Sequence, residues 1–228
     1  MKREIIITSD GSTTIHIPEW NEQYHSKHGA IQEAFHVFIK YGLDYVSAEN
    51  AMLRRSHEIS ILEIGFGTGL NAFITFLQSE NLVCNIDYVG VEAYPVPKRE
   101  ISKLNYVNQL EAEDHINVFE SMHDCSWGMK HPLGKKFFLT KQKKFFNEIN
   151  DTGKYHLIYF DAFGARVQPS LWTEAIFELM YNALRVNGVL VTYSAKGSVR
   201  RAMQSVGFIV ERLPGPPGKR EMLRALKR

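Results

Sequence analysis

Short apolar runs and helical apolar patterns alternate along most of this 228-residue chain. Apolar runs that are typical of buried strands occupy residues 61–64, 86–92, 137–140, 155–161 and 188–194. Between them, apolar side chains recur at helical spacing over residues 70–79, 98–110, 173–184 and 199–206. Strands that alternate with helices predict a mostly parallel sheet with helices on both faces.

The N-terminal part of the chain has a different pattern. Residues 4–8 and 13–17 are β-like stretches, and Asp10-Gly11 between them is a hairpin signal. Helical patterns follow, one that ends near Tyr41 and one over residues 46–55. We therefore expect a hairpin and two helices before the alternating part begins.

The C-terminal end also departs from the alternation. Residues 208–213 and 221–227 read as two strands joined by a proline- and glycine-rich turn, which predicts an antiparallel pair. We divide the chain into an N-terminal hairpin and helical extension, residues 1–58, and one α/β domain, residues 59–228.

A glycine-rich turn separates the first strand of the alternating part from its helix. Residues 61–71 read ILEIGFGTGLN, in which Gly65, Gly67 and Gly69 lie in the turn. Glycine suits this place because a positive φ costs it nothing and because it has no Cβ to hold a ligand away from the backbone. Strand, glycine turn and helix form the first half of a nucleotide-binding βαβ unit.

The spacing of these glycines distinguishes between nucleotide ligands. A dinucleotide fingerprint is G-x-G-x-x-G, but Leu70 stands where its last glycine would be. G-x-G-x-G after Glu63 resembles the first motif of class I S-adenosylmethionine methyltransferases, whose methyl donor has no phosphate. Glu92 follows the next strand, 92 − 69 = 23 residues beyond Gly69, where an acid that binds ribose hydroxyls is expected at about 20 residues. The alternative is a tight turn without a ligand.

Asp161 ends the apolar run 155–161 in the segment YFDAFG. Ligands of open α/β sheets bind beyond the carboxyl ends of the strands, so we expect Asp161 to face the methyl donor. A carboxylate in that place can orient a nucleophilic amine and take up its proton. A cap of the following turn is the alternative role. Phe163 either stacks on a flat base or packs in the core.

The charge of the chain is unevenly distributed. The net charge of the chain is only +2. From Lys196 to the end, however, there are nine Lys and Arg residues and only two acidic residues, Glu211 and Glu221, so this segment has a net charge of +7. A second basic stretch runs through residues 130–144. Clustered cations indicate a polyanionic partner, although a solvated face has the same composition.

Several other protein classes are disfavoured by the composition. No run approaches the ~20 apolar residues of a membrane span, and the N-terminal apolar stretch is too short for a signal peptide. Cys84 and Cys125 lie far apart and form no C-x-x-C motif, and the nine histidines show no metal-ligand spacing. We therefore expect a cytoplasmic protein, without a metal site and not bound to a membrane.

Four motifs in order, between about residues 60 and 226, resemble those of the MnmC-like tRNA-modifying methyltransferases. LEIGFGTGLN at residues 62–71 is similar to the family signature E-x-G-F-G-T-G-L-N. Residues 160–172 resemble D-G-F-x-P-x-x-x-P-x-x-W. SAKGSVRR at 194–201 and GKREM at 218–222 complete the series. The upstream Tyr24-His25-Ser26 also looks like the family's N-terminal region.

The resemblance implies a class I, Rossmann-like methyltransferase with a mostly parallel seven-stranded sheet. It implies S-adenosylmethionine as cofactor, tRNA as partner, and N-methylation of the 5-aminomethyl group of wobble 2-thiouridine to 5-methylaminomethyl-2-thiouridine. Asp161 is then the catalytic residue. The implied cofactor-binding residues are Glu63, Gly65, Phe66, Gly67, Gly69, Leu70, Asn71, Glu92 and Asp161. The implied substrate-binding residues are Tyr24, Phe163, Lys196, Arg200, Arg201, Lys219 and Arg220.

The chain stops at Arg228, so it resembles the stand-alone type without an oxidase domain, and no flavin is expected. It departs from the family at Ala162, where glycine is usual, and at Ala165, which replaces a proline. Residues 140–143 also lack the acid that often follows the third strand on the adenine side. Two other functions fit the same residues: a methyltransferase for another amine, and a catalytically silent RNA-binding fold.

Overall fold

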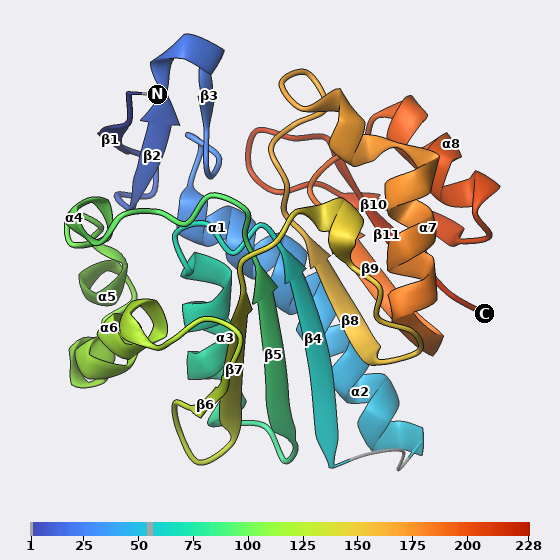
Figure 1. The fold of residues 1–228 in the computed structure, drawn as a ribbon, viewed down its shortest axis with the longest axis horizontal. Helices are drawn as coiled ribbons and strands as arrows, with labels where there is room; N and C mark the ends of the chain where they lie inside the picture. Colours follow the sequence, from blue (N-terminus) through green and yellow to red (C-terminus); the bar gives the residue numbers. More distant parts are fainter. Residues whose placement is uncertain (1, 54–56) are drawn as a thin grey trace.

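An eight-stranded mixed sheet forms the centre of the computed structural model, which describes residues 2–53 and 57–228 (Figure 1). Across the sheet the strands are β10 (Ile209–Pro214), β11 (Glu221–Leu226), β9 (Leu184–Thr192), β8 (Tyr155–Phe160), β4 (Glu58–Ile64), β5 (Asn85–Val91), β7 (Phe137–Gln142) and β6 (Lys130–Pro132). Strands β9, β8, β4, β5 and β7 are parallel, while β11 is antiparallel to both of its neighbours. The predicted parallel sheet and its antiparallel C-terminal pair are thus confirmed.

Strand β6 was not expected from the sequence. It is three residues long and pairs antiparallel with β7 at one edge of the sheet, so the sheet has eight strands rather than seven. A three-residue stretch that ends in proline carries no alternating apolar pattern, which is why the sequence does not reveal it.

Side chains of the central strands enter two hydrophobic cores, one on each face of the sheet. In β4, Ile59 and Ile61 belong to the first core, and Leu62 and Ile64 belong to the second. The first core is covered by α3 (Leu70–Ser79), α4 (Lys98–Ile101), α5 (Tyr106–Gln109), α6 (Ile116–Asp124) and the helical segment before β4. Helices α7 (Glu174–Ala183) and α8 (Gly197–Ser205) cover the second. The predicted layers are confirmed; the predicted helix 98–110 is divided into α4 and α5.

The helical segment before β4 is continuous rather than divided in two. It comprises α1 (Ala30–Ala34), a π-helical stretch (Phe35–Leu43) and α2 (Asp44–Leu53). Gly42 lies against the sheet, where a Cβ would be 3.1 Å from Cγ2 of Val191. The segment shares the first core with the sheet. Residues 54 and 55 of the predicted helix lie outside the described residues, and the division of the chain at residue 58 stays a prediction.

A small sheet lies beyond the carboxyl ends of the central strands (Figure 1). It contains β1 (Glu4–Ile7), β2 (Thr13–Ile17) and β3 (Glu22–Gln23), and its first two strands form the predicted hairpin. Asn105, between α4 and α5, accepts a hydrogen bond from the backbone N–H of Thr13 at 2.8 Å. Within the described residues, none of the helices is long and apolar enough to cross a bilayer.

One close contact fixes the glycine turn on the sheet. Gly90 in β5 lies directly beneath the ring of Phe66, and a Cβ on Gly90 would overlap that ring. Phe66 is 4% exposed, so a shift of its ring would disturb the packing around it. The close approach of a strand and an aromatic ring therefore requires glycine at position 90.

We expect Gly90→Ala to lower the free energy of unfolding by about 1–3 kcal/mol, because an added methyl group overpacks a filled core. Urea unfolding measures this cost. Phe66→Leu is the matched background: it creates room for the methyl group, so the double variant should lose less stability than the sum of the single variants. Additive losses would show that the two residues are not in conflict.

Candidate functional site

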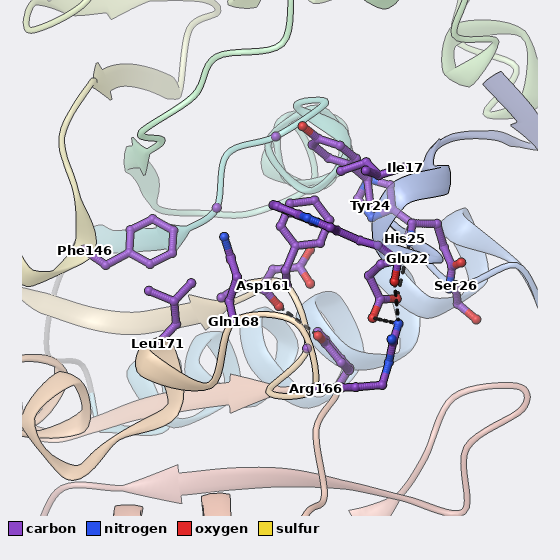
Figure 2. A pocket seen from close by; sticks show the side chains of 18 of the residues that line it. Ile17, Glu22, Tyr24, His25, Ser26, Phe146, Asp161, Arg166, Gln168 and Leu171 are labelled. Carbon is purple, nitrogen blue, oxygen red and sulfur yellow. Dashed lines mark hydrogen bonds and ion pairs between the residues drawn. The ribbon is translucent and has the colours of Figure 1, made fainter. Parts of the chain in front are cut away.

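A cleft of about 1160 Å³ opens between the small sheet and the carboxyl ends of β4, β5 and β8. Gly65, Gly67, Glu92 and Asp161 line its side formed by the large sheet. Residues of the small sheet and the loop after it, among them Tyr24 and those labelled beside it in Figure 2, line the opposite side. The cleft is large enough for a nucleoside-sized ligand together with a second group.

The glycine turn and Glu92 form one hydrogen-bonded unit. The backbone N–H groups of Gly65 and Phe66 both donate to the carbonyl of Val91 at 3.0 Å. The Glu92 carboxylate accepts from the N–H of Gly67 at 3.0 Å and from that of Tyr94 at 2.9 Å. Its two oxygens are thereby fixed, and each keeps a lone pair for a further donor.

The lack of side chains in the glycine turn lets neighbouring groups lie close to its backbone at the cleft wall. Gly65 and Gly67 have φ values of +92° and +50°. A Cβ on Gly67 would lie 3.2 Å from the Tyr24 ring, and one on Gly65 would lie 2.7 Å from the carbonyl oxygen of Asp161. Bare backbone next to a fixed carboxylate fits a nucleoside whose ribose hydroxyls donate to Glu92, as S-adenosylmethionine requires.

The other residues predicted to bind the cofactor do not line this cleft. Phe66 and Leu70 are core residues, 4% and 1% exposed. Gly69 lies at the start of α3 with φ +73°. Glu63 and Asn71 are buried behind the turn, 1% and 2% exposed. These residues shape or support the cleft, and direct contact of any of them with the cofactor stays a prediction.

Asp161 follows β8 and is held from two sides. Its backbone N–H donates to the carbonyl of Ile64 at 3.0 Å. The Asn71 amide donates to the Asp161 carboxylate at 2.8 Å and also to that of Glu63 at 3.0 Å. Asn71 thus joins two carboxylates that come from adjacent strands.

The proton affinity of Asp161 is unusual for an aspartate. Burial raises its pKa to about 7, and the negative charge of Glu33 acts in the same direction. The hydrogen bond from Asn71 and the charge of Lys219 oppose this rise. Burial also raises the pKa of Glu63 well above its ordinary value. Asp161 can therefore gain or lose a proton near neutral pH, as a general base must.

Aromatic side chains line the part of the cleft nearest the small sheet. The ring of Phe163 lies 4.9 Å from that of Tyr24 and 5.6 Å from that of Trp20, edge to face in both cases. Phe163 lines the cleft rather than either hydrophobic core, which favours its interpretation as a ligand contact. Trp20 was not found from the sequence, because a lone tryptophan before a short strand carries no motif.

Arg166 connects the loop after β8 to the small sheet, and sequence reasoning missed it. Its guanidinium donates to the backbone carbonyls of Trp20 and Asn21 at 3.1 and 2.9 Å and to the carboxylate of Glu22 at 3.3 Å. Figure 2 shows Arg166 and Glu22 side by side at the cleft. These bonds hold the aromatic side chains over the cleft.

His25 and Thr68 join the small sheet to the glycine turn. The His25 ring nitrogen Nε2 and the Thr68 hydroxyl are 2.8 Å apart, and the Tyr106 hydroxyl donates to the same Thr68 oxygen at 3.1 Å. Burial lowers the pKa of His25 to about 4, and the charge of Lys219 lowers it further. His25 is therefore neutral near pH 7, which suits a structural hydrogen bond rather than a charge.

The end of the cleft beyond Glu92 lacks the acid that the family often has after the third strand. Tyr94, Phe145, Phe146 and Asn147 line it. In the segment 140–143, Lys141 is 1% exposed and its ammonium donates to the carbonyl of His123 at 2.7 Å. An aromatic and amide lining can hold a flat base without an acid.

The predicted basic residues are only partly brought together. Lys196 and Lys219 line the cleft, whereas Arg200, Arg201 and Arg220 are not among its lining residues. Other cations of the C-terminal cluster have internal roles: Lys227 donates to the carbonyls of Tyr181 and Leu184, and Arg224 pairs with Glu211. In the second basic stretch, Lys130 pairs with Asp87 and Lys141 is buried. The two clusters therefore do not act as two undivided cationic surfaces.

Comparisons with known proteins agree with the fold and with the cofactor. Residues 135–228 match a family described as S-adenosyl-L-methionine-dependent methyltransferase. A bifunctional tRNA 5-methylaminomethyl-2-thiouridine biosynthesis protein, MnmC, from Leptospira borgpetersenii is 31% identical over 216 residues, 90% of this chain and 32% of that protein. Its namesake from Nitrosospira multiformis is 28% identical over 90% of this chain and 34% of that protein. This chain thus spans about a third of the length of these relatives.

A solved structure, MnmC2 from Aquifex aeolicus, has the same fold. Its TM-score is 0.74 at 24% identity, over 98% of this chain and 69% of that one. The strand order and the antiparallel C-terminal pair described above are those of the class I methyltransferase fold. Over nine tenths of its length this chain is therefore similar to the MnmC proteins, and its residues 135–228 match the S-adenosyl-L-methionine-dependent methyltransferase family.

Proposed function

We propose that this protein transfers a methyl group from S-adenosylmethionine to the 5-aminomethyl group of a wobble 2-thiouridine in tRNA, which yields 5-methylaminomethyl-2-thiouridine. The observation that carries the proposal is Asp161, a half-buried carboxylate whose pKa is raised to about 7, in the same cleft as the glycine turn and Glu92. The names of the MnmC relatives support the choice of tRNA and of this nucleoside.

The proposed reaction requires the residues only to orient the reactants and to accept a proton. S-adenosylmethionine supplies a methyl group on a sulfonium that is already activated, so no covalent enzyme intermediate is required. Asp161 accepts the proton that the amine loses and directs the nitrogen lone pair toward the methyl carbon. Asn71 keeps the Asp161 carboxylate in place through its 2.8 Å hydrogen bond. Glu92 holds the ribose, and Tyr24 and Phe163 are placed to contact the base.

The tRNA is expected to approach the open side of the cleft. Lys27 and Lys196 are exposed there, and both line the cleft. Exposed cations around an aromatic-lined opening suit a nucleic acid whose backbone stays outside while one base enters. A cytoplasmic location, and the absence of metal and flavin, stay predictions.

One experiment tests the proposed function directly. Purified protein with labelled S-adenosylmethionine should methylate tRNA that carries 5-aminomethyl-2-thiouridine, and nucleoside mass spectrometry should find the label in 5-methylaminomethyl-2-thiouridine. Free alkyl amines and tRNA that lacks the aminomethyl group are the controls. Labelling of free amines at a similar rate would favour a methyltransferase for another amine, and S-adenosylmethionine binding without any acceptor would favour a silent fold.

We expect Glu92→Ala to weaken S-adenosylmethionine binding by about 1.5–3 kcal/mol, the range for hydrogen bonds to a charged group. Isothermal calorimetry measures this. Glu211→Ala is a matched control, because Glu211 pairs with Arg224 and neither residue lines the cleft. Wild-type affinity in the Glu92 variant would show that the ribose is held elsewhere.

We expect kcat/KM for tRNA to rise with pH as Asp161 loses its proton, because only the carboxylate form accepts a proton. The pKa of about 7 places this rise near neutral pH in the free protein, and a bound sulfonium should move it lower by favouring the carboxylate. Asp161→Asn should remove the rise and lower turnover by about 10²–10⁴-fold, with cofactor affinity kept. A variant rate within about threefold of wild type at every pH would make Asp161 a structural residue.

We expect the double variant Lys27→Gln, Lys196→Gln to flatten the salt dependence of tRNA binding. Each lost phosphate contact should reduce the slope of log K against log salt by about 0.7–0.9. Lys135→Gln is the matched control, since Lys135 precedes β7 at the opposite, amino-terminal end of the parallel strands. An unchanged slope in the double variant would mean that these two lysines are merely solvated.

A further inference from the structure

One corner of the cleft already holds an alkylammonium ion, that of the protein's own Lys219. Lys219 lies in the segment between β10 and β11, and its Nζ donates to the Glu33 carboxylate. The same Nζ lies 3.9 Å from the centroid of the Tyr193 ring. A carboxylate combined with an aromatic face is the chemistry by which proteins bind alkylammonium groups.

The other two members of this corner are rigidly built. The Glu33 side chain is 7% exposed, and one of its oxygens accepts the backbone N–H of Ser26 at 3.2 Å. The Tyr193 hydroxyl donates to the carbonyl of Ala162 at 2.8 Å, which fixes the ring beside Asp161. Lys219 is the movable member, because its side chain is 31% exposed. Glu33, Tyr193 and Lys219 line the same cleft as Asp161.

We propose that the corner formed by Glu33 and Tyr193 is the binding site for the acceptor ammonium, and that Lys219 occupies it until the substrate displaces it. The inference rests on the proposed function and adds to it the group that recognises the amine. A buried carboxylate left without a partner is costly, and an exchange of one ammonium for another keeps Glu33 paired throughout. The vacated Lys219 ammonium can then turn toward solvent at the cleft opening.

This placement also brings the amine to its proton acceptor. Asp161 precedes Ala162, whose carbonyl holds Tyr193, and Glu33 and Lys219 both lie close enough to affect the proton affinity of Asp161. A substrate ammonium bound at the corner would release its proton to Asp161, and its nitrogen would then carry the lone pair that attacks the methyl carbon. Glu33 would thus bind the cation, and Asp161 would deprotonate it.

The first test needs no tRNA, so it does not depend on the proposed reaction. Lys219→Ala empties the corner. Methylammonium chloride should then raise the melting temperature of this variant by about 2–4 °C over sodium chloride at equal ionic strength. Wild type should respond little, because its own tethered ammonium competes at high effective concentration. The double variant Glu33→Gln, Lys219→Ala should not respond. Equal melting temperatures in both salts for Lys219→Ala would overturn the proposal.

The second test uses Glu33→Gln, which keeps Lys219. Affinity for tRNA that carries the aminomethyl group should fall about 10- to 100-fold, the range for a hydrogen bond to a charged group, while affinity for tRNA without that group stays unchanged. Glu211→Gln is the control, because Glu211 also pairs with a cation, Arg224, but does not line the cleft. Equal losses for both tRNAs would overturn the proposal. A methylammonium response without any methylation of tRNA would instead keep the ammonium site and refute the proposed function.

Discussion

The cleft depends on the partial burial of the Asp161 carboxylate at the end of β8. Removal of a carboxylate from water costs several kcal/mol unless partners compensate for the lost hydration. Among the described residues its hydrogen-bonding partner is the Asn71 amide, which Glu63 shares. This limited compensation leaves the protonated and ionised forms close in free energy near pH 7. Asn71 belongs to helix α3, and Glu63 belongs to strand β4. The Asn71 amide therefore fixes α3 and β4 relative to β8, and it also lowers the pKa of Asp161.

Both halves of the chain are required to form the cleft. Several contacts join the small sheet to the α/β fold, among them Thr13 to Asn105, His25 to Thr68, and Arg166 to the residues around Trp20. The α/β side offers the glycine turn, Glu92 and Asp161, which suit the cofactor and the proton. The N-terminal side offers aromatic rings and Glu33. In the proposed reaction the two reactants are held by different parts of the chain. The cofactor lies on the large sheet, and the N-terminal side contributes to recognition of the acceptor.

Local chemistry made much of this predictable from the sequence. Gly65, Gly67 and Glu92 were found because a turn with positive φ and an acid after the next strand leave a fixed spacing in the sequence. The parallel sheet was found because its buried strands are continuous apolar runs. In contrast, Glu33 and Arg166 act through partners 186 and 144–146 residues away, and no local pattern records such contacts. The short β6 and the π-helical stretch after α1 were missed for the related reason that tertiary packing, rather than local periodicity, determines them.

The basic clusters illustrate the same limit from the opposite direction. The number of cations can be read from the sequence. Which of them already have a carbonyl or carboxylate partner cannot, and Lys141 and Lys227 are two that do. What remains around the cleft is a gradient of charge with depth. Lys27 and Lys196 are exposed at its opening, whereas Glu33 and Asp161 lie inside.

Such a gradient separates two tasks that a uniformly basic site could not perform together. Cations at the opening attract phosphates, which stay in solvent because the acidic interior repels them. The interior instead favours positive groups, and both reactants of the proposed reaction carry one: the sulfonium of the methyl donor and the ammonium of the acceptor. Two cations placed side by side repel each other, and this repulsion weakens the acceptor's hold on its proton. A carboxylate that accepts protons near pH 7 is the group to which that proton can move, so the burial that makes Asp161 costly also suits it to the reaction.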